Sequence, residues 1–109
     1  MPKGLDVMQG TLDLLILKAL AVAPMHGWGI SNQIQQLSRN AFRIGQGSLY
    51  PALHRLENRG WLTSYWRTTD NQRIARVYEL TAPGRQQLEE EVRAWRSYAS
   101  AVDSVLGAQ

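Results

Sequence analysis

Residues 47–66 read GSLYPALHRLENRGWLTSYW, and the residue types in this stretch change from helix-forming to strand-forming at Gly60. Apolar residues at positions 49, 52, 53 and 56 recur at the spacing of one helical face, which predicts a helix over Ser48 to Arg59. Pro51 falls in the first turn, where its missing amide costs nothing, and Gly60 stands where a C-terminal cap is expected. The aromatic and β-branched residues that follow predict a strand.

A β-hairpin is predicted directly after this helix. Residues 61–66 and 75–80 are rich in aromatic, β-branched and hydroxyl side chains, and the polar run 69–73 separates them. Leu62 and Trp66 share one face of the first strand, and Tyr78 and Leu80 share one face of the second. We expect these faces to cover a helical core and the arginine-bearing tip to lie in solvent.

Two further helices are predicted upstream. Apolar residues at one helical spacing indicate a helix over Thr11 to Ala23, with its first residue as the cap and Asp13 in the first turn, where the helix dipole favours an anion. Pro24 and Gly27 then indicate a turn that ends this helix, and a second amphipathic helix follows from Trp28 to Ser38. His26, just before Gly27, is expected to cap or to form a hydrogen bond.

The C-terminal region predicts one long helix with an unpartnered apolar seam. Thr81 can cap it and Pro83 falls in its first turn. Its apolar residues follow a 4-3-4-3-4 spacing from position 88, which is typical of helices that pair as coiled coils. At about 1.5 Å per residue, a helix of about 25 residues is longer than a core of three short helices can cover. We therefore expect a homodimer with contacts from Leu12, Leu15, Leu88, Val92, Trp95, Ala99, Val102 and Leu106.

Composition narrows the classes of function. The 109 residues suit one globular unit, ten of the twelve basic residues are arginines, and the formal charge of +3 favours a polyanionic partner. The absence of cysteine excludes disulfides and thiolate metal sites and suits the cytoplasm. Asp13 and Lys18 interrupt the apolar N-terminal stretch, so we predict neither a signal peptide nor a membrane span.

An enzyme is a poor match to these residues. The two histidines fall on different predicted helices, and the aspartates are scattered without a nucleophile and base or a phosphate-binding loop. Metal ligands at sensible spacing are also missing. We therefore predict no catalytic residues, no metal and no cofactor.

The element order instead predicts a mainly α fold with a small two-stranded β-wing, a winged helix-turn-helix over residues 1–81 and a dimerisation helix over 82–109. The third helix of such a domain enters the DNA major groove, and the wing lies along the flanking backbone or minor groove. The candidate DNA contacts are the outward residues of that helix and the arginines of the wing: Ser48, Tyr50, Pro51, His54, Arg55, Asn58, Arg67, Arg73 and Arg76. The alternative is a winged helix that binds only protein, but the recognition surface is basic rather than acidic or apolar.

These blocks also resemble a known family. The chain is similar to the PadR family of bacterial regulators from about Leu12 to the C-terminus. Three blocks carry the resemblance: GSLYPALHRLENRGWLTSYW, ARVYELTAPGRQQL after it and LDLLILKALAVAPMHGWGI upstream of it. The resemblance implies a winged-helix homodimer, usually a repressor on an inverted repeat, whose terminal helix packs on the partner's N-terminal helix and which a small molecule often releases. Two departures stand out: Gly29 replaces a glutamate common in the family, and Arg73 and Arg76 replace a denser basic run in the wing.

Trp95 has two interpretations. It can simply pack in the dimer seam, or its two copies can flank a central cavity and stack on a flat aromatic effector, as the resemblance implies for short members of the family. The sequence leaves both open. No motif in the sequence identifies the operator, the regulated genes or the effector.

Overall fold

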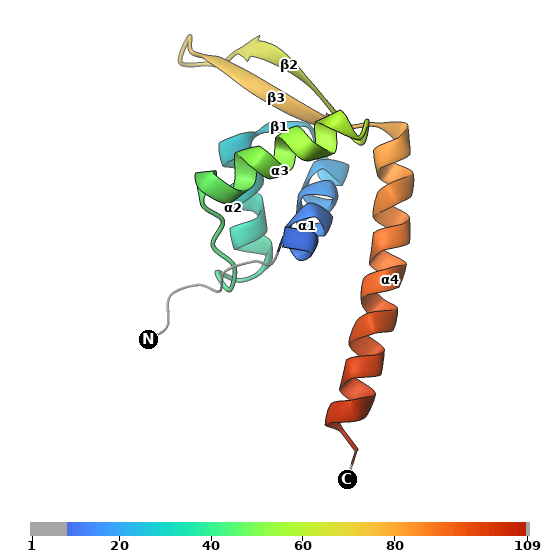
Figure 1. The fold of residues 1–109 in the computed structure, drawn as a ribbon. Helices are drawn as coiled ribbons and strands as arrows, with labels where there is room; N and C mark the ends of the chain where they lie inside the picture. The colour runs from blue at the N-terminus through green and yellow to red at the C-terminus, as the bar shows by residue number, and fades with distance from the viewer. Residues whose placement is uncertain (1–8, 109) are drawn as a thin grey trace.

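The computed structural model describes residues 9–108, in which four helices support a small antiparallel sheet (Figure 1). The elements follow the order α1 (Gln9–Val22), β1 (Met25–His26), α2 (Gly27–Leu37), α3 (Gln46–Asn58), β2 (Leu62–Thr68), β3 (Ile74–Leu80) and α4 (Ala82–Leu106). This order confirms the predicted winged helix-turn-helix followed by one long helix. The first eight residues of the predicted DNA-binding domain lie outside the described range.

The sheet has three strands, and the prediction of a two-stranded hairpin was incomplete. β1 pairs antiparallel with β3, Met25 opposite Tyr78 and His26 opposite Val77, so that the strand order is β1-β3-β2. A two-residue strand carries no periodicity that a sequence could reveal, because its formation depends on a free β3 edge about fifty residues away. We call the longer hairpin of β2 and β3 the wing.

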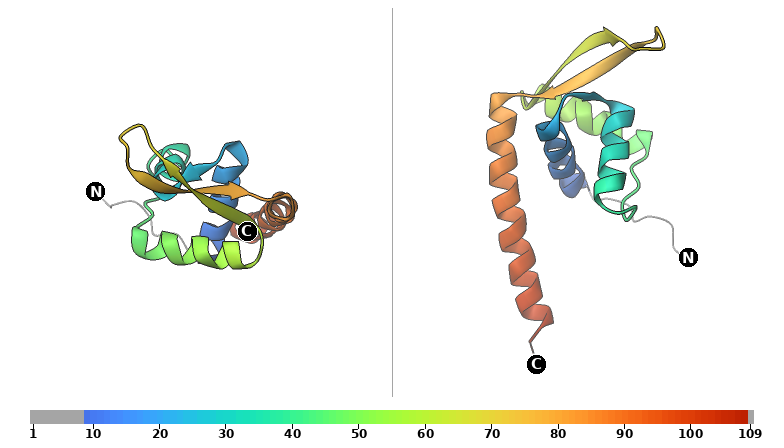
Figure 2. Two further views of the ribbon diagram at one scale, coloured as in Figure 1. Left: turned by 90° about the horizontal axis from the view of Figure 1, so that it is seen from above. Right: turned by 180° about the vertical axis from the view of Figure 1, so that it is seen from behind.

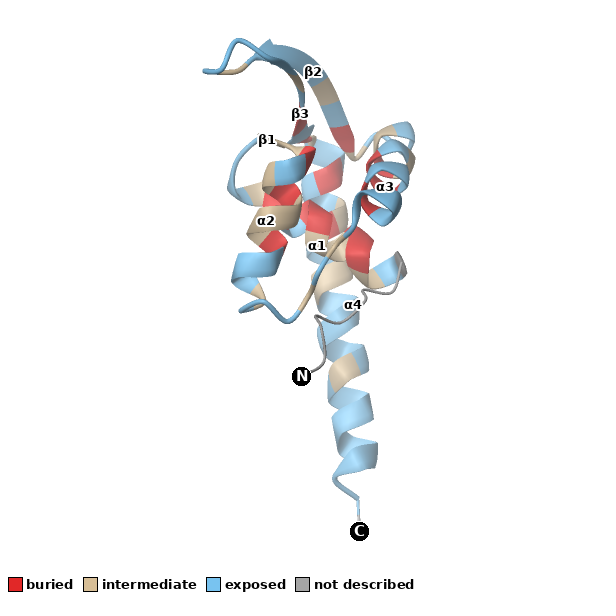
Figure 3. Cartoon of the chain, turned by 90° about the vertical axis from the view of Figure 1, so that its left-hand side faces the viewer, coloured by how far each residue is buried: buried red, intermediate tan, exposed pale blue. Residues whose placement is uncertain are grey.

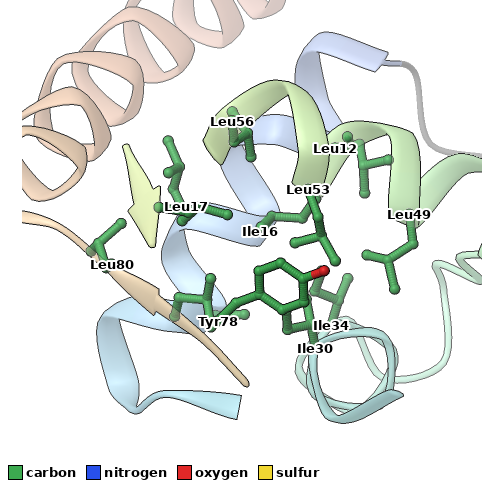
Figure 4. Packing of buried hydrophobic residues seen from close by; sticks show 14 of the residues in the cluster. Leu12, Ile16, Leu17, Ile30, Ile34, Leu49, Leu53, Leu56, Tyr78 and Leu80 are labelled. Atoms are coloured by element: carbon green, nitrogen blue, oxygen red, sulfur yellow. The ribbon is translucent and has the colours of Figure 1, made fainter. Parts of the chain in front are cut away.

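The core lies between the helices and the base of the wing. Ile16 and Leu17 of α1 are fully buried at its centre, and α3 contributes Leu49, Ala52, Leu53 and Leu56, as its spacing predicts. Leu62, Tyr78 and Leu80 close the core from the wing, and Figure 4 shows the last two beside the helical residues. The inward face of α3 is thereby fixed, and its polar residues must face solvent.

Three predicted helix ends are confirmed. The Gly84 amide donates to Thr81 Oγ1 at 3.0 Å at the start of α4, and the Gly29 amide donates to His26 Nδ1 at 3.1 Å at the start of α2. At the end of α3, Gly60 has φ +80°, and its amide donates to the Glu57 carbonyl at 3.0 Å. Glycine adopts this left-handed conformation without the steric cost of a Cβ, so the chain can leave α3 and enter the wing.

The predicted start of α1 was wrong. The helix begins at Gln9, so Thr11 lies within it and does not cap it, and Asp13 lies beyond the first turn. Asp13 is buried, with 8% of its surface exposed, and therefore needs a partner from another element rather than a helix dipole.

The wing extends away from the helices beyond its base (Figures 1 and 2). Leu62 is buried, but Trp66, four residues further along the same face, is 66% exposed. The expectation that Trp66 covers the core was wrong because the strands are longer than the core beneath them.

α4 lies alongside α1 at its start and then continues past the helical core (Figure 2). Its buried residues are Gly84 and Leu88, both in the first two turns, and its C-terminal half is almost entirely exposed (Figure 3). None of the helices in residues 9–108 has the length and apolar character needed to cross a bilayer.

Candidate nucleic-acid interface

The exposed face of α3 carries most of the predicted DNA contacts. With its apolar residues turned into the core, five side chains or ring surfaces remain in solvent: Ser48, Tyr50, Pro51, His54 and Asn58. We call this set the reading face. Gly45, the N-cap, supplies no side-chain hydrogen bond, so first-turn amides at the positive end of the helix dipole are available to an anion.

Tyr50 holds the start of α3 close to the start of α2. A Cβ placed on Gly27 would lie 2.8 Å from Tyr50 Oη and 3.0 Å from the ring carbon Cε1, so the ring packs directly on the Gly27 backbone. The ring is nevertheless partly exposed. The Tyr50 side chain therefore lies at the junction of the two helices, packed on one side and open to solvent on the other.

Arg55, also predicted as a DNA contact, is not part of the reading face, because its guanidinium is paired within the chain. Its Nη2 donates to Asp13 Oδ1 at 2.6 Å, and the two side chains are 26% and 11% exposed. A buried carboxylate is costly without a hydrogen-bonded cation, and Arg55 is the cation that the fold supplies. The pair connects α3 to α1.

The three wing arginines differ in their surroundings. Arg76 donates from Nε to Ser64 Oγ at 2.8 Å, and its Nη2 lies 3.5 Å from Glu57 Oε1, so it joins the wing to α3. Ser64 donates in turn to Glu57 Oε2 at 2.5 Å. Arg67 and Arg73 are exposed. Of the predicted wing contacts, these two present their charge to a partner, whereas Arg76 is partly committed within the chain.

The predicted dimer residues fall into three groups. Leu12 and Leu88 are buried in the core of the single chain, at 2% and 7% exposure, and so offer little surface to a second copy. Leu15, Val92 and Ala99 are half-buried, while Trp95, Val102 and Leu106 are exposed. A groove of about 690 Å³ between α1 and α4 is lined by Leu14, Leu15, Phe42, Val92 and Trp95, together with the polar residues Thr11, Lys18, Glu89, Arg93 and Arg96 and the buried Leu88.

Sequence reasoning missed a second apolar row on α4. Tyr98 and Val105 are strongly exposed and, with Val102 and Leu106, form an apolar surface at the end of the helix. The signal was present, because positions 94, 98, 101 and 105 repeat the 4-3-4 spacing of the seam one residue earlier. The exposed apolar face is therefore broader than one seam.

Comparison with known proteins assigns the family. The model of the transcriptional regulator PadR-like family matches residues 16–90. The chain belongs to this family. A transcriptional regulator of Mycobacterium tuberculosis is 39% identical over 104 residues, which cover 95% of this chain and 91% of that protein. PadR-like proteins are regulators of transcription that bind DNA and not enzymes.

Solved PadR structures share the fold. A PadR family regulator from Eggerthella lenta superposes with a TM-score of 0.78 at 28% identity, over 93% of this chain and 86% of that one. A PadR family regulator from Clostridium difficile gives 0.77 at 28% identity, over 90% of this chain and all of that one. The winged helix and the long α4 described above are thus shared with solved PadR-family structures.

Glu91 of α4 has a buried carboxylate oxygen, Oε2, that lacks a hydrogen-bond partner. No other acidic side chain within residues 9–108 has such an oxygen. Burial raises the pKa of Glu91 above its usual value of 4.5, and the nearby Asp13 carboxylate raises it further. Because the folded pKa exceeds the unfolded one, the folded chain holds the extra proton, and stability falls as pH rises through this window. Glu91 thus opposes folding at neutral pH.

Replacing Glu91 with glutamine is expected to stabilise the protein at neutral pH by up to about 1 kcal/mol, since the amide carries no charge to desolvate. The gain should disappear at a pH well below 4.5, where the carboxyl is protonated in both the folded and the unfolded state. Urea denaturation at two pH values, at one protein concentration, measures both effects. Glu90→Gln on the exposed side of α4 is the matched control. An equal gain at both pH values would contradict the assigned cause.

Within residues 9–108, no three His, Cys, Asp or Glu side chains are grouped so that they could hold a metal ion.

Proposed function

We propose that this chain is a sequence-specific DNA-binding repressor that acts as a homodimer on an inverted-repeat operator. The observation that carries the proposal is the reading face of α3, because its polar side chains are exposed at a helix that the core holds rigidly. The family membership of the chain supports the same function. A helix of this width fits the major groove of B-DNA, where each base pair presents a distinct pattern of donors and acceptors.

Each part of the surface has a role in this proposal. His54 and Asn58, further along α3, reach base edges, while Ser48 and Tyr50 near its start bind phosphate oxygens. Arg67 and Arg73 of the wing add electrostatic contacts to the flanking backbone. Arg55 serves the interface indirectly, by holding α3 on α1.

The homodimer is proposed from the apolar surface of α4. The exposed side chains Trp95, Tyr98, Val102, Val105 and Leu106 lie on one helix, and grouped apolar residues on a surface mark sites of protein contact. A second copy covers it, so residues 1–81 act as the DNA-binding part and 82–109 as the dimerisation part. A two-fold axis then spaces the two α3 helices about 34 Å apart, one turn of DNA, which matches a near-palindromic operator.

The groove between α1 and α4 is the proposed effector site. Its volume of about 690 Å³ lies in the range of ligand pockets, and the half-exposed Trp95 ring offers a stacking surface for a flat aromatic molecule. Binding there releases the operator in the proposed mechanism. If the partner helix instead fills the groove, flat aromatic compounds will leave tryptophan fluorescence unchanged.

A salt titration tests the DNA-binding proposal. Anisotropy of a labelled duplex, selected by the purified protein from a random pool, should show affinity that falls with a log-log slope of about −0.9 per phosphate neutralised. His54→Ala is expected to lose about tenfold in affinity for that duplex, because one base contact contributes about 1–3 kcal/mol. Gln86→Ala, on the exposed side of α4, is the control. Salt-independent binding, or no selection at all, would favour the protein-interaction alternative.

A further inference from the structure

An open cleft of about 800 Å³ lies beneath the wing, next to the reading face. One wall is the wing surface that carries Trp66 and Arg76, which are opposite each other in the β2–β3 register. The other wall is formed by Trp28 at the start of α2 and Tyr50 at the start of α3. The cleft therefore lies where the wing overhangs the starts of both helices of the turn motif.

The cleft is aromatic and carries only positive charge. Trp28 and Trp66 are 68% and 66% exposed, although large apolar rings are usually buried in a subunit of this size. The Arg76 guanidinium lies 5.6 Å from the Trp66 ring, a cation–π contact that holds the ring in place. Arg73 also lines the cleft, and no Asp or Glu is among the described residues that do so.

These features suit a polyanion that also presents apolar faces. A DNA strand alternates phosphates with deoxyribose rings, so it can place charge near Arg73 and apolar atoms on the tryptophans. Tyr50 belongs to both the cleft and the reading face, which makes the two surfaces continuous.

We propose that this cleft receives the DNA strand flanking the bases read by α3, with the rings of Trp28 and Trp66 packed on its deoxyribose faces. The inference rests on the proposed DNA-binding function and adds a contact of a different physical kind. Packing on sugars buries apolar area and releases no counterions, so its contribution to affinity is independent of salt. Arg73 supplies the salt-dependent part at the same place.

The test compares variants of the intact protein on the selected duplex across a range of salt concentrations. Trp66→Ala should weaken binding about tenfold at every concentration with an unchanged slope, because the apolar area that the ring buries against deoxyribose is lost; tenfold corresponds to about 1.4 kcal/mol. Trp28→Ala should behave alike, and Trp66→Phe should restore most of the affinity. Arg73→Ala should instead reduce the slope by about one.

Tyr65→Ala is the matched control, because Tyr65 precedes Trp66 in β2 and points to the opposite face of the wing. Hydroxyl-radical footprinting adds a second readout: Trp66→Ala should lose protection of the sugars beside the α3 site. Unchanged affinity of Trp66→Ala, or an equal loss in Tyr65→Ala, would overturn the proposal. If the unmodified protein binds no duplex, the proposed DNA-binding function itself is wrong. If the unmodified protein binds and the tryptophan variants bind with the same affinity, only this inference is wrong.

Discussion

Val102→Asp is expected to leave the protein monomeric and to weaken operator binding by about 100-fold or more, because two linked half-sites gain about 10²–10⁴ over one. Val102 lies in the exposed apolar half of α4, and a carboxylate placed there would have to be desolvated against a second apolar helix. The fold of each subunit should survive, since the core lies at the other end of α4. Sedimentation velocity and anisotropy measure the two effects.

Ser100→Asp is the control for this variant. Ser100 is exposed and lies on the polar side of the same helix, so the added charge remains in water. It should leave both dimerisation and DNA affinity unchanged. A Val102→Asp protein that still sediments as a dimer would refute the assignment of this surface to a second copy.

Gly84→Ala is expected to lower the free energy of unfolding by about 3 kcal/mol and the Tm by more than about 10 °C. Gly84 lies in the first turn of α4, against Trp61, which follows α3, and against Leu80 at the base of the wing. An added Cβ would overlap the Trp61 carbonyl oxygen and lie 2.9 Å from Leu80 Cδ1. The carbonyl cannot easily move, because it accepts a hydrogen bond from the Thr81 amide at 3.1 Å.

Gly10→Ala serves as the comparison for this substitution. Gly10 is in α1 with nothing within 4 Å of an added Cβ, so alanine should stabilise the helix by about 0.5–1 kcal/mol. Thermal melts followed by circular dichroism measure both variants. If Gly84→Ala has the same Tm as the unmodified protein, the close approach at this junction is not as tight as described.

α1 links the two functional surfaces. It holds α3 through the Asp13–Arg55 ion pair, and it forms the groove beside Trp95 with α4. Glu91 of α4 lies near enough to Asp13 to raise its own pKa.

The sequence by itself determined the order and type of the main elements. Local signals sufficed: apolar residues at 49, 52, 53 and 56 defined the inner face of α3, and Gly60 and Thr81 marked the ends around the wing. The outward face of α3 follows from the inward one, so most of the reading face was predictable. Family blocks in the same stretch then indicated the function.

Only the tertiary structure decided what depends on residues distant in sequence. Arg55 turned inward because Asp13, 42 residues earlier, is buried and needs a cation. β1 formed because β3 had an edge available for strand pairing. Trp66 is exposed because the strands of the wing extend beyond the core. A helical or strand period shows which residues share a face, but not how far the neighbouring elements reach to cover it.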